Sequence, residues 1–291
     1  CKEVGFDLEL GIHLKNLVAM ATGQSRFKTV SSLDITRLQS AWNDACEGMN
    51  FAMNFLKSNV GIDSPALLSS PSMMVAISYF GHKRNYLISP DESKLLRYWV
   101  LAANAKGRFS RGSSETLLDQ DIASIRGGGD IQDLIDRLRS QVGKLEISPE
   151  ELSGRNQRSA LFKTMFLAFR SAGAKDWHSN LTIALDHSGA QHRLQFHHIF
   201  PKAVLTKAGV ISREADDISN LAFIGGKTNR VISNKPPKEY LAFFATKSGE
   251  EGFRVQEIPL DPELLDTPAY KKFLEVRRER IANRLNLFIS G

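Results

Sequence analysis

The sequence predicts a mainly α protein, in which a multi-helix domain is followed by two short strands, a helix behind them and a long C-terminal helix. Three observations predict this class. Apolar residues recur every three or four positions through most of residues 1–180. Several of these stretches begin with residues that cap helices. Only two short segments, 194–200 and 221–224, have the composition of strands, and Gly225-Gly226 closes the second.

The first well-marked helix follows Asp34, a residue that can cap a helix N-terminus. Its apolar residues recur at helical spacing. They are Ile35, Leu38, Trp42, Cys46, Met49, Met53 and Leu56. Cys46 lies on this stripe, so we expect it in the core rather than at the surface as a reactive thiol.

Besides a helix that ends before Gly127, three more helices are expected before residue 180, at 90–105, 130–141 and 157–171. The first has a well-formed start, because Ser89 can cap it and Pro90 suits its first position. Gly127-Gly128-Gly129 precedes the second helix. A triple glycine can cradle a phosphate, but no strand precedes this one and no Gly-Lys-Ser/Thr follows it. We interpret it as a flexible connector.

Two helices are expected after the strands. One begins at Pro236, and Thr267-Pro268 opens a long helix to Ile289 whose apolar residues can pack back onto the helical region. The charged run Arg277-Arg278-Glu279-Arg280 on that helix is most simply a solvated face, with DNA contact as the alternative. This organisation gives two domains, residues 1–180 and 181–291.

Composition limits the class of protein. The chain has 38 Lys and Arg against 32 Asp and Glu, a net charge of +6, and residues 191–240 hold 8 basic and 4 acidic residues, which is +4 of that excess. A local positive field suits a protein that binds a phosphate backbone, although many basic proteins never bind nucleic acid.

There is no long apolar run, no signal-like N-terminus and no disulfide framework, so we expect a cytoplasmic protein without membrane contact.

One short window combines the side chains that phosphodiester hydrolysis requires. The segments are His197-His198-Ile199-Phe200-Pro201, Asn220-Leu221 and Gly225-Gly226-Lys227-Thr228-Asn229-Arg230. The reaction needs a base near neutral pH, a cation that neutralises developing charge, and donors that position the phosphate. Neighbouring side chains on a strand point to opposite sides, so the two histidines cannot do the same job. A histidine pair alone, or an Asn-Arg pair alone, is usually an ordinary surface or core feature. Only the combination of the two indicates a site.

This order of residues resembles the HNH, or ββα-metal, endonucleases, in which two strands and a helix hold one metal ion against a phosphodiester. The resemblance implies that His197 binds the metal, that His198 is the general base and that Asn229 is an oxygen ligand from the helix. It gives Asn220 a structural role, in which its amide ties the loop between the strands to the backbone. Such ligands suit one divalent ion, Mg²⁺ by preference and Mn²⁺ or another divalent ion as alternatives.

Four residues near the motif are candidates for accessory roles. Ser233 lies one turn beyond Asn229 and could supply an accessory oxygen ligand, although a solvated serine is the more common outcome. Three basic residues are candidate phosphate contacts, with ordinary solvation as the alternative: Lys227, Arg230 and Lys235. Many HNH proteins also brace their fold with two Cys-x-x-Cys pairs around zinc. This chain has only Cys1 and Cys46, so no structural zinc is expected.

The resemblance extends to the C-terminal region of the GmrSD-type restriction and phage-defence nucleases. It is carried by HIFPK at 198–202, ISNL at 218–221 and ISNKPPKEYL at 232–241, and more weakly by 95–99 and 107–110. It implies an effector that nicks or cleaves DNA in modification-dependent defence. Such proteins usually begin with a nucleotide-binding sensor domain. Because this chain starts at Cys1, we expect that domain, or a partner subunit, to lie outside it, and a homo-oligomer stays open.

Two other functions stay open. The chain could be a catalytically idle DNA-binding or regulatory module of a defence complex, which would bind DNA without metal-dependent nicking. It could also be an RNA-directed nuclease with the same chemistry. Matched DNA and RNA substrates discriminate the latter, because the sequence contains no recognisable reader of the 2′-hydroxyl group.

Overall fold

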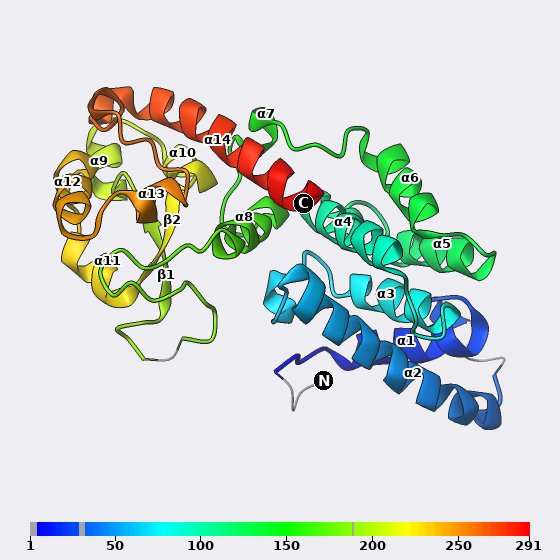
Figure 1. Ribbon diagram of the computed structural model, residues 1–291. Helices are drawn as coiled ribbons and strands as arrows, with labels where there is room; N and C mark the ends of the chain where they lie inside the picture. Colours follow the sequence, from blue (N-terminus) through cyan, green and yellow to red (C-terminus); the bar gives the residue numbers. More distant parts are fainter. Residues whose placement is uncertain (1–4, 29–32, 188) are drawn as a thin grey trace. The chain divides into compact units, whose positions relative to one another are not determined.

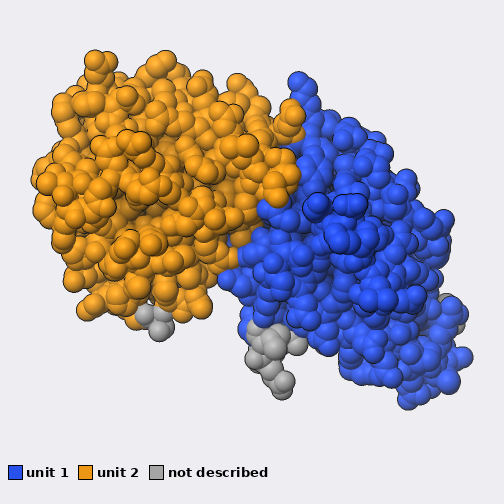
Figure 2. All heavy atoms as spheres, viewed as in Figure 1, with its two compact units in different colours: residues 1–145 blue, residues 146–291 orange. Residues whose placement is uncertain are grey.

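The computed structural model describes residues 5–28, 33–187 and 189–291, and the chain is mainly helical, as predicted (Figure 1). It divides into two compact units, residues 1–145 and 146–291 (Figure 2). This division differs from the predicted boundary at residue 180, because residues 146–180 belong to the second unit. In the described part of the chain, no helix is both long and apolar enough to cross a membrane.

The first unit is built from six α-helices and short 3₁₀ and π turns within its described residues. The α-helices are α1 (Leu10–Thr22), α2 (Ile35–Phe55), α3 (Ser72–Lys83), α4 (Pro90–Lys106), α5 (Ser114–Arg126) and α6 (Ile131–Val142). The predicted caps are present: the Asp34 side chain accepts a hydrogen bond from the Arg37 amide, and Ser89 and Glu92 form a capping box. The helices expected at 90–105 and 130–141 are confirmed.

The orientation of α2 differs from the sequence prediction. Ile35 and Trp42 are 72% and 58% exposed, and Cys46 is exposed rather than in the core. Met49, Met53 and Leu56 are buried as predicted, and the packed face also carries small residues, among them Ala41, Ala45 and Gly48. A Cβ at Gly48 would collide with the Ser78 side chain on α3, so the glycine allows the two helices to approach closely. Close packing against α3 at Gly48 thus accounts for the small residues on this face, while Ile35 and Trp42 lie outside it.

The second unit contains the only two strands of the described chain and eight α-helices. In chain order its elements are α7 (Pro149–Leu152), α8 (Ala160–Ser171), β1 (Leu194–His198), α9 (Lys202–Lys207), α10 (Ser212–Ala215), the 3₁₀ turn Ile218–Asn220, β2 (Leu221–Gly225), α11 (Gly226–Ile232), α12 (Pro237–Ser248), α13 (Glu251–Arg254), the 3₁₀ turns Pro262–Leu264 and Thr267–Ala269, and α14 (Tyr270–Ser290). β1 and β2 are antiparallel, with Leu194 opposite Gly225 and His198 opposite Leu221. α11 begins directly after β2.

Helices cover both faces of the two-stranded sheet. On one face Phe223 packs against Phe162 and Phe166 of α8, with ring centroids 5.0 and 5.3 Å apart. On the other face Ala222 and Ile224 join a core formed with α11, α12 and α14. α14 also packs against α7 and α8. A two-stranded sheet is marginally stable by itself, so these two layers hold the strands in place.

Side chains complete the outer edge of β2. The Gln256 amide accepts a hydrogen bond from Phe223 N (2.8 Å) and donates one to Phe223 O (2.8 Å), and the Asp176 carboxylate accepts one from Gly225 N (2.7 Å). Buried Arg277 donates to Ser219 O (2.7 Å) and Gln256 O (3.0 Å). The prediction that Arg277 belongs to a solvated face is therefore wrong, because backbone carbonyls beside the sheet take the place of water as its acceptors.

Candidate functional site

Strand β1 directs its two histidines to opposite faces of the sheet. His197 is buried, with 4% of its surface exposed, and lies on the face covered by α11 and α12. The His198 side chain is 27% exposed and lies on the other face. The two imidazoles therefore have different surroundings although they are neighbours in the chain.

His197 meets Asn229 of α11. Its Nδ1 lies 2.9 Å from Asn229 Oδ1, and the rings of Trp177 and Tyr240 stand nearly perpendicular to it at 6.1 and 5.5 Å between centroids. Burial lowers the pKa of His197 to about 4, against the weaker opposing effect of the hydrogen bond with Asn229. The imidazole is neutral at physiological pH, which is the form that binds metals.

This pair fits two ligands of a hard divalent ion. Two adjacent ligands of an octahedral Mg²⁺, each at about 2.1 Å, lie about 3.0 Å apart. The separation of His197 Nδ1 and Asn229 Oδ1 is close to this. The other ring nitrogen, Nε2, is buried and has no hydrogen-bond partner. Among the described residues no three His, Cys, Asp or Glu side chains form a group that could hold a metal, so water and substrate oxygens would complete the coordination of an ion here.

His198 is held by a carboxylate that sequence reasoning missed. Its Nε2 lies 2.9 Å from Asp216 Oδ1, and the other carboxylate oxygen of Asp216 accepts a hydrogen bond from Lys202 Nζ at 2.9 Å. Burial acts to raise the pKa of Asp216, but the hydrogen bonds from Lys202 and His198 outweigh it, and the pKa lies below its ordinary value. A charged carboxylate accepts, so the network assigns the proton of His198 to Nε2 and leaves the lone pair on Nδ1. The sequence feature that could have indicated this carboxylate is the acidic pair Asp216-Asp217, shortly before Asn220.

Asn220 and Asp217 hold the loop between the strands. The buried Asn220 amide accepts a hydrogen bond from Phe200 N (2.8 Å) and donates to Phe200 O (3.1 Å) and Ala215 O (2.9 Å). The Asp217 carboxylate, 1% exposed, accepts from the amides of Ser219 and Gly154, both at 2.8 Å. These contacts are with protein backbone, and Asp217 is also paired with Arg278 at 2.7 Å, so both side chains act as supports.

The four accessory candidates lie at the surface. Lys227, Arg230, Ser233 and Lys235 are exposed, and the Arg230 guanidinium donates to Ala190 O at 3.0 Å. α11 ends at Ile232, and Ser233 follows it with φ 53° and ψ −124°, so it does not continue the helix from Asn229 as expected. Within the described residues none of these four side chains makes a hydrogen bond or ion pair with His197, His198 or Asn229.

A pocket of about 560 Å³ lies beside His198. Its charged lining residues come from separate segments: Arg158 precedes α8, Lys202 begins α9, Arg213 lies in α10 and Asp216 follows α10. Asn156 and Gln157 contribute neutral amides. We call this the His198 pocket.

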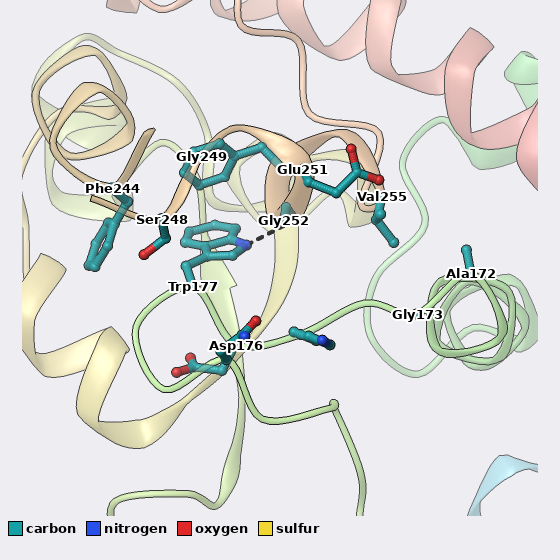
Figure 3. Close-up of a pocket in the computed structure, with 13 residues that line it drawn as sticks. Ala172, Gly173, Asp176, Trp177, Phe244, Ser248, Gly249, Glu251, Gly252 and Val255 are labelled. Carbon is teal, nitrogen blue, oxygen red and sulfur yellow. Dashed lines mark hydrogen bonds between the residues drawn. The ribbon is translucent and has the colours of Figure 1, made fainter. Parts of the chain in front are cut away.

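A smaller pocket, of about 220 Å³, is lined by Trp177 (Figure 3). The Trp177 ring also contacts His197. The Trp177 indole donates to Gly252 O at 3.2 Å, as the dashed line in Figure 3 shows. The Asp176 carboxylate beside it already accepts hydrogen bonds from Gly225 N, Thr228 Oγ1 and Ser179 N. Burial acts to raise the pKa of Asp176, but these bonds outweigh it, and the pKa lies below its ordinary value. The carboxylate supports α11 and has little capacity left for a ligand.

The sequence matches no protein-family model. It is 24% identical over 238 residues to the uncharacterized protein MJ0686 of Methanocaldococcus jannaschii. That match covers 76% of this chain and 38% of the archaeal protein, so the chain spans well under half of that relative's length. The relative's name states no activity and assigns none here.

Proposed function

We propose that this chain is a metal-dependent nuclease of the HNH type that hydrolyses phosphodiester bonds of DNA. The observation that supports it best is the division of roles on β1, where a neutral, buried His197 meets the Asn229 oxygen and its neighbour His198 is solvent-accessible and oriented by Asp216. The order of β1, β2 and α11 matches the ββα-metal unit that the sequence resembles.

The chemistry of His198 follows from its contacts. With Nε2–H donated to Asp216, Nδ1 accepts a proton from the attacking water, and the carboxylate stabilises the imidazolium that forms. His197 and Asn229 would hold the divalent ion, which neutralises the charge that develops on the phosphate and the leaving oxygen. The products carry 5′-phosphate and 3′-hydroxyl ends, and one site cuts one strand.

A plasmid-nicking assay with Mg²⁺ tests this function. His198→Ala removes the base and is expected to lower the nicking rate by at least 10²-fold, the usual contribution of a general base. Asn229→Ala should instead raise the Mg²⁺ concentration needed for half-maximal rate, because it removes a ligand. The exposed His192→Ala variant, which also loses one imidazole, is the matched control and should nick like the wild type. Nicking by His198→Ala at the wild-type rate would contradict the proposal.

The biological setting that we propose rests on the resemblance alone. As the effector part of a modification-dependent restriction or anti-phage protein, this chain would supply the cutting site, and another domain or subunit would supply recognition. Comparing DNA and RNA of matched sequence in the same assay tests the substrate class. Faster cleavage of RNA would replace DNA as the proposed substrate.

A further inference from the structure

Two arginines of the His198 pocket have no acidic partner. The pocket is lined by three cations, Arg158, Lys202 and Arg213, and by one carboxylate, Asp216, which gives a net charge of +2 with His198 neutral. Asp216 is already in contact with His198 and Lys202. Among the described residues no carboxylate forms an ion pair with Arg158 or Arg213, and both arginines are exposed. The charge imbalance favours an anion in the pocket.

The backbone around these arginines is fixed by buried groups. Asp217 accepts hydrogen bonds from Gly154 N (2.8 Å) and from Arg278 (2.7 Å), and Ile218 N donates to Arg155 O (2.8 Å). These bonds tie the loop before α8, which carries Arg158, to the segment that follows α10. The hydrogen bonds of Asp217 and Ile218, which hold the loop after β1, therefore also help to position the backbone at Arg158 and Arg213.

Gly154, beside Arg213, is favoured by its backbone conformation rather than by crowding. A Cβ at Gly154 would lie 3.4 Å from the Arg213 guanidinium, and Gly154 has φ +67°, which side-chain-bearing residues rarely adopt. In the same loop, the Asn156 side chain accepts a hydrogen bond from Arg158 N at 2.9 Å. Local turn geometry thus orders the backbone of this loop before any ligand is present.

We infer that the His198 pocket binds phosphate groups of the nucleic-acid backbone that flank the bond to be cut, with Arg158 and Arg213 as the contacts. A guanidinium offers planar paired donors that match two phosphate oxygens, and unpaired arginines lose no ion pair when they bind. The pocket volume lies within the range of about 300–1,000 Å³ typical of ligand sites. The inference rests on the proposed function and extends it to one arginine that precedes both strands and one that lies between them.

Salt-dependent DNA binding tests this inference. Binding of a labelled duplex to the whole chain is measured by fluorescence anisotropy in EDTA, which prevents cleavage, at about 50 to 200 mM KCl. Each lost phosphate contact reduces the slope of log K against log[KCl] by about 1. Arg158→Gln and Arg213→Gln should each show this reduction. The wild type should bind the duplex more tightly than the double variant, and the ratio of their affinities should fall by about tenfold across this salt range.

Matched variants separate a specific contact from a general loss of charge. Arg254→Gln with Lys272→Gln removes the same two charges from exposed positions on α13 and α14, where each has its own carboxylate neighbour, and should leave the slope unchanged. Arg158→Lys and Arg213→Lys retain the charge and should retain most of the slope. Circular dichroism and the Tm establish that each variant is folded.

The outcomes distinguish this inference from the nuclease proposal. If the double variant keeps the wild-type slope while the wild type nicks DNA, the pocket inference is overturned and the nuclease remains. If the slope falls as expected but no divalent ion supports nicking, the phosphate site stands and the proposed function fails. If the double variant loses inorganic phosphate binding but keeps its DNA slope, the pocket holds a free phosphate and the inference is overturned. A wild type that binds no DNA overturns both.

Discussion

At the scale of residues, the environment separates two side chains that are identical in the sequence. His197 lies among aromatic rings and meets an amide oxygen, whereas His198 meets a carboxylate at the edge of a pocket. The sequence predicted that the two histidines would differ, because alternation along a strand is a local property. It could not identify Asp216 as the partner of His198, because that contact spans 18 residues and depends on how the loop folds.

The burial of His197 predicts a loss of stability in acid. The unfolded chain takes up a proton on this residue near pH 6.5 and the folded chain only near pH 4. The contribution of His197 to the free energy of unfolding is therefore complete above pH 6.5. It is lost progressively as the pH falls towards 4 and does not change further below that. It amounts to about 3 kcal/mol.

Urea unfolding in EDTA, measured from pH 7 to pH 4, checks this prediction. Replacing His197 with Gln should flatten the pH dependence over that interval, whereas replacing the exposed His192 with Gln should not. An equal acid sensitivity of wild type and His197→Gln would mean that other groups cause the loss.

Asp216 is expected to be a positioning residue for His198. Asp216→Asn keeps the shape of the side chain but removes the charge that stabilises the imidazolium, so kcat for nicking should fall by about 10²–10⁴-fold. KM for DNA and the Tm should change little, because the Asp216 side chain is 39% exposed and lies beside His198 rather than in the core. Asp216→Glu should recover part of the rate. A fall in Tm with kcat unchanged would instead indicate a structural role.

At the scale of elements, local signals were sufficient to place helices but not to orient them. Asp34, Ser89 and Asp130 each cap a helix through a residue three positions on, a distance that sequence alone can read. The exposed face of α2 was mispredicted because Gly48 and the alanines allow close packing against α3, which is a property of two helices together. The hydrogen bonds between Gln256 and the backbone of Phe223 could not be predicted from sequence either, since the two residues lie 33 positions apart.

Gln256 is predicted to stabilise the sheet through its two hydrogen bonds. Gln256→Ala leaves Phe223 N and O buried without partners and should lower the free energy of unfolding by about 2–3 kcal/mol. Hydrogen exchange at the Phe223 amide should accelerate along with this loss. Gln132→Ala, at an exposed position of α6, should change stability by less than about 0.5 kcal/mol. Unchanged protection of the Phe223 amide would show that the side-chain edge is dispensable.

At the scale of the whole molecule, the motif residues were found because they lie within about one strand–loop–strand–helix stretch of sequence, 194–230. The limits of the unit around them were not found. From its sequence, α8 looks like one more helix of the helical domain predicted for residues 1–180. In the structure its phenylalanines cover the sheet through contacts with Phe223, which lies more than fifty residues later in the chain. Arg158 was missed for the same reason, because only the fold brings it beside His198.

The division of the chain predicts which fragments fold. Residues 146–291 include α7, α8 and both faces of the sheet, and should show a cooperative urea transition and Mg²⁺-dependent nicking. Residues 181–291, which follow the boundary expected from sequence, lack the α8 phenylalanines and should expose Phe223 and fail to unfold cooperatively. Circular dichroism with urea compares the two. Equally cooperative unfolding of the shorter fragment would refute the boundary at residue 145.

The finished edge of β2 also restricts how copies of this chain can assemble. The backbone N and O of Phe223 and the N of Gly225 are already satisfied by Gln256 and Asp176, so a strand from a second molecule cannot pair with these groups. A duplex severed on both strands requires two active centres or two encounters. If two molecules act together, they cannot extend the sheet through these backbone groups of β2.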